Sequence, residues 1–70
     1  MSLKHAKLTN RLRVLRAERD MTQEDLAKAV GVTRQTIIAI EKGDYAPSLL
    51  LGMQLARYFG KSTDEAFSLE

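Results

Sequence analysis

The sequence predicts a small all-α domain built from five short helices. Apolar residues recur at three- and four-residue spacing along the chain, and no stretch alternates with a period of two. Residues typical of helix ends, chiefly Ser, Thr and Gly, separate these stretches at short intervals. The 70 residues contain no internal repeat or linker, so one domain accounts for them. We place this domain at residues 10–67, between an N-terminal arm at residues 1–9 and a C-terminal tail at residues 68–70.

The first two predicted helices lie in the N-terminal half of the chain. An apolar stripe of Leu8, Leu12 and Leu15 marks the first helix. The second helix begins after Thr22, an N-cap residue followed by two acidic residues, and it ends at Gly31, which suits a left-handed cap. Its expected buried face consists of Leu26, Ala27 and Val30.

Three further helices follow. Thr33 predicts the N-cap of the third helix, which runs to Lys42 and stops at Gly43. The fourth runs from about Leu49 to Phe59, with Ser48 as its cap, and Ser62 with Glu65 has the form of a capping box for a short fifth helix. The expected core side of the fourth helix is formed by Leu49, Gly52, Leu55, Ala56 and Phe59.

Composition excludes several classes of protein. The chain has no cysteine and one histidine, so we expect no disulfide, no metal site and no catalytic constellation, and therefore neither an enzyme nor a cofactor. No stretch approaches the roughly 20 apolar residues of a membrane span, and no leader resembles a signal peptide, so a cytoplasmic protein is expected. A domain of this size buries only about 60% of its unfolded surface, so a second subunit is the remaining source of added stability.

The charge is distributed unevenly. Residues 1–42 carry nine basic and five acidic side chains, whereas residues 43–70 carry two basic and four acidic ones. A basic half fits a polyanionic partner such as nucleic acid, and an ordinary solvated helix surface is the alternative that charge alone leaves open.

The link between the second and third helices is too short for an antiparallel pair. Residues 30–33 join them, so the two helices must cross steeply, as in a helix-turn-helix. Ala27 permits close approach of the two backbones, Gly31 permits the turn, and Ile37 with Ile40 supplies the inner face of the third helix.

The stretch MTQEDLAKAVGVTRQTIIAIEKG, followed by YAPSLLLGMQLARYFG, closely resembles the Cro/cI (XRE) helix-turn-helix regulators. The resemblance extends from about Asn10 to Phe67. Its fixed points are Thr22-Gln23, Leu26-Ala27, Gly31, Ile37, Ile40, Glu41, Gly43 and Pro47-Ser48-Leu49. It implies a lambda-repressor-like fold with a helix-turn-helix at helices two and three. It also implies a transcriptional regulator, expected to be a repressor, that binds double-stranded DNA at a pseudo-palindromic operator.

The outer face of the third helix carries the expected base contacts. An α-helix fits the major groove, where arginine can donate to guanine and glutamine can pair with adenine. Arg34 and Gln35 have these chemistries, and Ile38 with Ala39 suits a thymine methyl group. Scattered surface apolar residues are the alternative explanation for Ile38.

Other polar residues flank this face and are expected to contact phosphate. Gln23 lies at the N-terminus of the second helix, where backbone N–H groups favour an anion, and the matching glutamine of the resembled family contacts phosphate and braces the recognition helix. The remaining expected phosphate contacts are Thr33, Thr36, Lys42 and Tyr45. A solvated loop position is the alternative for Tyr45.

Two further sets of residues are expected to be structural. Arg16 and Glu41 border the inner faces of the first and third helices, and family members often pair an arginine with a glutamate at the matching positions, so we expect a partly buried salt bridge. The fourth helix and the C-terminus carry more apolar residues than one side needs, which suggests a homodimer interface or, alternatively, core coverage. The candidate interface residues are Leu50, Leu51, Tyr58, Phe67 and Leu69.

One rival function stays open. An antitoxin or adaptor could keep this fold and act by holding a protein partner through the same apolar surface. No residues remain after the fifth helix for a ligand-binding domain, so no small-molecule effector is expected.

Overall fold

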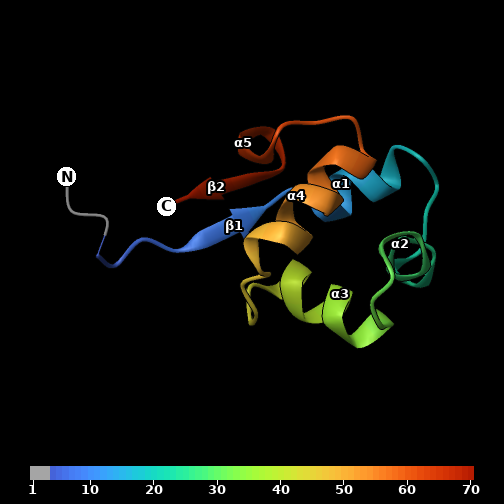
Figure 1. The fold of residues 1–70 in the computed structure, drawn as a ribbon, viewed down its shortest axis with the longest axis horizontal. Helices are drawn as coiled ribbons and strands as arrows, with labels where there is room; N and C mark the ends of the chain where they lie inside the picture. The colour runs from blue at the N-terminus through green and yellow to red at the C-terminus, as the bar shows by residue number, and fades with distance from the viewer. Residues whose placement is uncertain (1–3) are drawn as a thin grey trace.

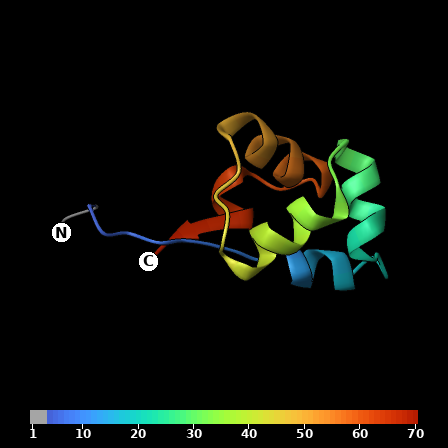
Figure 2. The same cartoon turned by 90° about the horizontal axis from the view of Figure 1, so that it is seen from below.

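The computed structural model describes residues 4–70, which form five helices and two short strands (Figure 1). The helices are α1 (Leu12–Ala17), α2 (Gln23–Val30), α3 (Arg34–Lys42), α4 (Leu49–Tyr58) and α5 (Thr63–Ala66). The strands are β1 (Leu8–Asn10) and β2 (Phe67–Leu69). Figures 1 and 2 show the strand pair projecting from one end of the helical body. The helical architecture agrees with the predicted fold class, and the strand pair is an addition to it.

Hydroxyl side chains cap α2, α3, α4 and α5, as their sequences predict. Thr22, Thr33, Ser48 and Ser62 each accept a hydrogen bond from the backbone N–H three residues further on. Each bond satisfies one of the N–H groups that a helix leaves unpaired at its first turn. Gly31 and Gly43, with φ angles of 76° and 83°, end α2 and α3 in the left-handed conformation.

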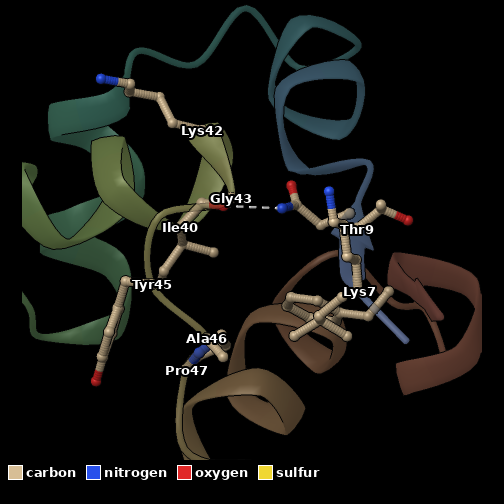
Figure 3. A pocket seen from close by; sticks show the side chains of 11 residues that line it. Lys7, Thr9, Ile40, Lys42, Gly43, Tyr45, Ala46 and Pro47 are labelled. Carbon is tan, nitrogen blue, oxygen red and sulfur yellow. Dashed lines mark hydrogen bonds between the residues drawn. The ribbon is translucent and has the colours of Figure 1, made fainter. Parts of the chain in front are cut away.

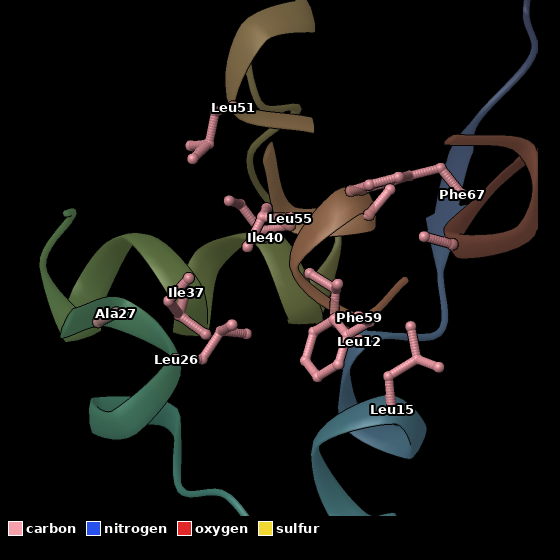
Figure 4. Packing of buried hydrophobic residues seen from close by; sticks show 12 residues of the cluster. Leu12, Leu15, Leu26, Ala27, Ile37, Ile40, Leu51, Leu55, Phe59 and Phe67 are labelled. Atoms are coloured by element: carbon pink, nitrogen blue, oxygen red, sulfur yellow. The ribbon is translucent and has the colours of Figure 1, made fainter. Parts of the chain in front are cut away.

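The core draws apolar side chains from every helix and from β2 (Figure 4). Leu12, Leu26, Ile37, Ile40 and Leu55 are fully buried and form its centre. Leu15, Ala27, Leu51, Ala56, Phe59, Ala66 and Phe67 complete the cluster. The inner faces predicted for α2 and α3 therefore lie in the core, which fixes the opposite face of α3 toward solvent.

The orientation of α4 differs from the prediction at two leucines. Leu49, expected in the core, is 75% exposed, whereas Leu51, expected at an interface, is only 9% exposed. Leu51 lies four residues before Leu55 and so shares its helical face, while Leu49 points away at the first turn. For Phe67, the sequence left open whether the side chain lies in the core or at an interface. The structure places it in the core.

The strand pair was not predicted. β1 and β2 are antiparallel, with Leu8 opposite Leu69, Thr9 opposite Ser68 and Asn10 opposite Phe67. The apolar stripe of the first helix therefore begins at Leu12, and Leu8 belongs to a strand. Three-residue strands are too short to show a period of two, and their partner lies at the far end of the chain.

Candidate nucleic-acid interface

α2 and α3 form the helix-turn-helix that the short link predicts. Figure 1 shows α2 nearly end-on while α3 lies across the view, so the two helices cross steeply. The left-handed Gly31 makes the turn, and the Val32 N–H donates to the Ala27 carbonyl at 3.0 Å. Ala27 is buried in the core, where its small side chain lets the two helices approach. The inner face of α3 packs against this unit, and its outer face lies at the surface.

The outer face of α3 presents polar and apolar groups side by side. Arg34 and Gln35, at the N-terminal end of α3, are exposed, and Ile38 and Ala39 follow at half-buried positions. Within residues 4–70, neither the Arg34 nor the Gln35 side chain has a hydrogen-bond or ion-pair partner. Their donors and acceptors are therefore available to another molecule.

The two threonines at the start of α3 bond to each other. The Thr33 hydroxyl accepts the Thr36 N–H at 3.2 Å, and the two hydroxyl oxygens lie 3.1 Å apart. Thr33 is thus a helix cap, and a hydroxyl oxygen retains acceptor and donor capacity beyond these bonds. Both residues stand at the N-terminal end of α3, where backbone N–H groups favour an anion.

Arg16 and Glu41 form a two-bond contact between α1 and α3. Arg16 Nε donates to Glu41 Oε2 at 2.6 Å, and its Nη2 donates to Oε1 at 2.9 Å. The side chains are 12% and 7% exposed, so the pair is largely withdrawn from water. Hydrogen bonding to Glu41 raises the pKa of Arg16, against the opposing effect of burial.

Gln23 joins this pair from α2. Its Nε2 donates to Glu41 Oε1 at 3.2 Å, while Arg16 Nη1 donates to the Met21 carbonyl at 2.9 Å. The network therefore ties α1, the segment before α2, and α2 itself to the C-terminal half of α3. Gln23 braces α3 in this way, and within residues 4–70 its side-chain oxygen accepts no hydrogen bond.

Two arginines that were not predicted as contact residues also lie beside α3. Arg11 and Arg13, at the start of α1, line a groove of about 430 Å³ together with Gln23 and Lys42. Both arginines are exposed. The signal in the sequence was the basic bias of the N-terminal half, but assigning it to this place required the packing of α1 against α3.

The last residue of α3 and the start of the loop after it are exposed. Lys42 Nζ lies 3.6 Å from the Asp44 carboxylate, an ion pair in solvent that contributes little to stability. Figure 3 shows the side chains of Lys42, at the end of α3, and of Tyr45, in the loop that follows, pointing in opposite directions. In this conformation the two side chains do not converge on one phosphate group.

The predicted interface residues divide into two groups. Leu50, Tyr58 and Leu69 are exposed, whereas Leu51 and Phe67 belong to the core. Leu49 and Met53 on α4, which were not predicted as interface residues, are exposed as well.

Known proteins are similar to this chain in sequence and in fold. Residues 12–65 match the helix-turn-helix family. An HTH-type transcriptional regulator of Methanocaldococcus jannaschii is 52% identical over 63 residues, which are 90% of this chain and 96% of that protein. The cryptic phage CTXphi transcriptional repressor RstR of Vibrio cholerae is 38% identical over 60 residues, which are 86% of this chain but 54% of that protein. The restriction-modification controller protein C.AhdI of Aeromonas hydrophila has a TM-score of 0.70 at 31% identity, over 77% of this chain and 82% of that structure.

The chain belongs to the Cro/cI-type (XRE) helix-turn-helix family. The resemblance predicted from the Thr22–Leu49 motif is thereby confirmed. This is a family of transcriptional regulators with a DNA-binding domain, and it is not a class of enzymes. Across residues 4–70, no helix has the length and apolar character that crossing a membrane requires.

Proposed function

We propose that the protein is a sequence-specific transcriptional repressor that inserts α3 into the major groove of double-stranded DNA. The observation that carries the proposal is the exposed outer face of α3, where Arg34 and Gln35 lack partners within residues 4–70. The inner face of the same helix is fixed by Ile37 and Ile40 in the core. A rigid helix with free base-reading groups is what major-groove recognition requires.

Each proposed base contact follows from side-chain chemistry. Arg34 can donate two hydrogen bonds to guanine O6 and N7, and Gln35 can pair with adenine N6 and N7. Ile38 and Ala39, further along the same face, offer only apolar contact, which suits a thymine methyl group. These four residues would set the sequence preference.

The proposed phosphate contacts surround this face. Gln23 and Thr33 lie at the starts of α2 and α3, and Thr36 lies in the first turn of α3. Lys42 is the last residue of α3, and Tyr45 lies in the loop after it. Arg11 and Arg13 add two basic side chains to this set, because they line a groove together with Gln23 and Lys42. Such contacts position the protein on the duplex without reading its sequence.

Repression and a twofold dimer are the remaining parts of the proposal. The relative RstR is named as a repressor, and a single helix-turn-helix covers only half of a typical operator. Two exposed apolar surfaces are available to a second copy, one formed by Leu50 and Tyr58 on α4 and the other by Leu69 at the strand pair. A dimer would place two α3 helices on a pseudo-palindromic operator, with half-sites about one helical turn apart.

The test is a selection of bound sequences from random duplex DNA, followed by titrations with the selected site. Arg34→Ala and Gln35→Ala should each lower discrimination at one base pair by about 1–3 kcal/mol. Arg57→Ala is the matched control, because Arg57 is an exposed arginine on α4. Unchanged base preference in both α3 variants would mean that α3 does not read the groove.

A further inference from the structure

The outer edge of β1 carries a row of unpaired backbone groups. Lys7 and Glu70 exchange backbone hydrogen bonds at 2.7 and 2.8 Å, and Arg11 N–H donates to the Ala66 carbonyl at 2.9 Å. Paired residues alternate in an antiparallel ladder, so the N–H and C=O groups of Ala6, Leu8 and Asn10 point away from β2. Within residues 4–70, no backbone hydrogen bond uses these groups.

The outer edge of β2 is less available. The Phe67 N–H already donates to the Thr63 carbonyl at the end of α5. A free strand edge is a template for pairing with another strand. Of the two edges of this sheet, the β1 edge therefore offers the longer unbroken row of donors and acceptors.

Open space adjoins the β1 edge. A groove of about 470 Å³ lies between residues 7–10 and the loop after α3, and Tyr45, Ala46 and Pro47 form its opposite side (Figure 3). At one end of the groove the Asn10 side chain donates to the Ile40 carbonyl at 3.0 Å, so the open part adjoins Lys7, Leu8 and Thr9. A neighbouring strand would lie about 4.8 Å from β1, inside this groove.

An apolar pair lies on one face of the strands. Leu8 and Leu69 are directly opposite each other and are 36% and 60% exposed. They share a face with Asn10 and Phe67, since side chains alternate along a strand. Phe67 is buried under the helices, so Leu8 and Leu69 extend the core-facing side of the sheet beyond the helical body.

We propose that this edge pairs with the β1 edge of a second copy, antiparallel and with Leu8 opposite Leu8. The inference rests on the dimer of the proposed function and assigns its contact surface. The product is a four-stranded sheet, β2-β1-β1-β2, with Leu69, Leu8, Leu8 and Leu69 in one row on one face. The twofold axis passes between the two Leu8 residues, so the contact is self-complementary.

The charges select this register. With Leu8 opposite Leu8, each Lys7 faces Thr9 of the second copy, and each Ala6 faces Asn10. A shift by two residues in one direction sets Lys7 opposite Arg11, and a shift in the other direction sets Lys7 opposite Lys7. Like charges directly opposite each other destabilise a strand pair. Further displacement in the first direction would bring Leu12, already helical, into the ladder.

A single cysteine tests the contact directly, because the natural chain has none. In a hydrogen-bonded antiparallel pair the Cα atoms are about 5.5 Å apart, which a disulfide can span. Leu8→Cys should therefore form a covalent dimer under mild oxidation, and exposed Leu50→Cys on α4 should not. Cross-linking of Leu50→Cys but not of Leu8→Cys would overturn the proposal in favour of α4.

Charge complementation tests the self-pairing of residue 8. Leu8→Lys and Leu8→Glu should each shift the protein from dimer to monomer in sedimentation, and an equimolar mixture should restore the dimer as a heterodimer. Thermal melting of each variant checks that the domain still folds. A mixture that stays monomeric, or single variants that stay dimeric, would overturn the proposal.

The outcomes separate this inference from the proposed function. If the wild-type protein is a dimer that binds its selected DNA site while both residue-8 tests fail, only the β1 edge is wrong. If the wild-type protein is monomeric at high concentration, the edge pairing and the dimer fail together. The base preferences of the Arg34 and Gln35 variants then still decide whether α3 reads DNA.

Discussion

Arg16 on α1 and Glu41 on α3 are joined by two hydrogen bonds of 2.6 and 2.9 Å although 25 residues separate them. Glu41 also accepts from Gln23 on α2, so one carboxylate connects three helices. The position of the candidate recognition helix thus depends on an ionic contact as well as on Ile37 and Ile40 in the core.

Arg16→Ala should lower the free energy of unfolding by about 3 kcal/mol, because it leaves the Glu41 carboxylate withdrawn from water without its main partner. Thermal and urea denaturation measure the loss. The double variant Arg16→Met/Glu41→Leu is the control and should be closer to wild type, since it leaves no unpaired charge. If Arg16→Ala melts at the wild-type temperature, the pair contributes nothing to the fold.

Gln23→Ala should separate stability from DNA binding. The lost bond to Glu41 is long and one of several, so the free energy of unfolding should fall by about 1 kcal/mol or less. Affinity for DNA should fall similarly for all sequences, because a phosphate contact reads no base. Gln23→Glu should weaken binding further, since a second carboxylate beside Glu41 repels both Glu41 and phosphate. A change in base preference in either variant would contradict this role.

Arg11 and Arg13 should determine part of the salt dependence of binding. Each phosphate contact contributes about −0.9 to the slope of log K against log salt concentration. Arg11→Ala and Arg13→Ala should therefore each make the slope shallower by about one unit without altering base preference. Titrations at several salt concentrations measure the slope, with Arg57→Ala as the control. An unchanged slope would place both arginines outside the DNA contact.

Two glycines should respond oppositely to alanine. Gly31 has a φ angle of 76°, so Gly31→Ala should destabilise the protein by about 1 kcal/mol through backbone strain, although its Cβ would meet no neighbour. Gly52 lies within α4, and a Cβ there would meet Pro47 and Phe67 at ordinary contact distances of 3.8 and 3.9 Å. Gly52→Ala should therefore stabilise the helix by about 0.5–1 kcal/mol. Paired thermal melts test both, and destabilisation by Gly52→Ala would indicate tighter packing around α4.

The carboxylates of Asp25 and Glu65, which accept the backbone N–H groups of the N-cap residues Thr22 and Ser62, should contribute to stability only above acidic pH. Hydrogen bonds from Thr22 and Ser62 lower the pKa values of Asp25 and Glu65 below their ordinary 3.8 and 4.5. A carboxyl whose pKa is lowered by folding stabilises the folded state above its ordinary pKa, and this contribution disappears as the pH falls through the lowered value. Denaturation of Asp25→Asn/Glu65→Gln should therefore depend less on pH below about 4.5 than denaturation of the wild type. Parallel curves for the two proteins would contradict this assignment.

The helix caps and the turn of the helix-turn-helix could be predicted from the sequence. Thr22, Thr33, Ser48 and Ser62 cap their helices, and Gly31 makes the turn of the helix-turn-helix, because caps and turns depend on residues only a few positions apart. The faces of α2 and α3 were also readable, since each carries a clear helical period. The family follows from the same motif.

The face of α4 and the ends of the chain were decided by tertiary structure. The N-terminal half of α4 is apolar on nearly all sides, so its own period could not tell Leu49 from Leu51, and only packing against the core buried Leu51. β1 and β2 form only because helix packing brings Leu8–Asn10 beside Phe67–Leu69 from the opposite end of the chain. The same packing places Arg11 and Arg13 beside Gln23 and Lys42. The sequence alone determined which helices form and which surface of α3 is free, because these depend on short-range spacing. Long-range contacts between segments decided the formation of the sheet, its open edge and the position of Arg11 and Arg13 beside α3.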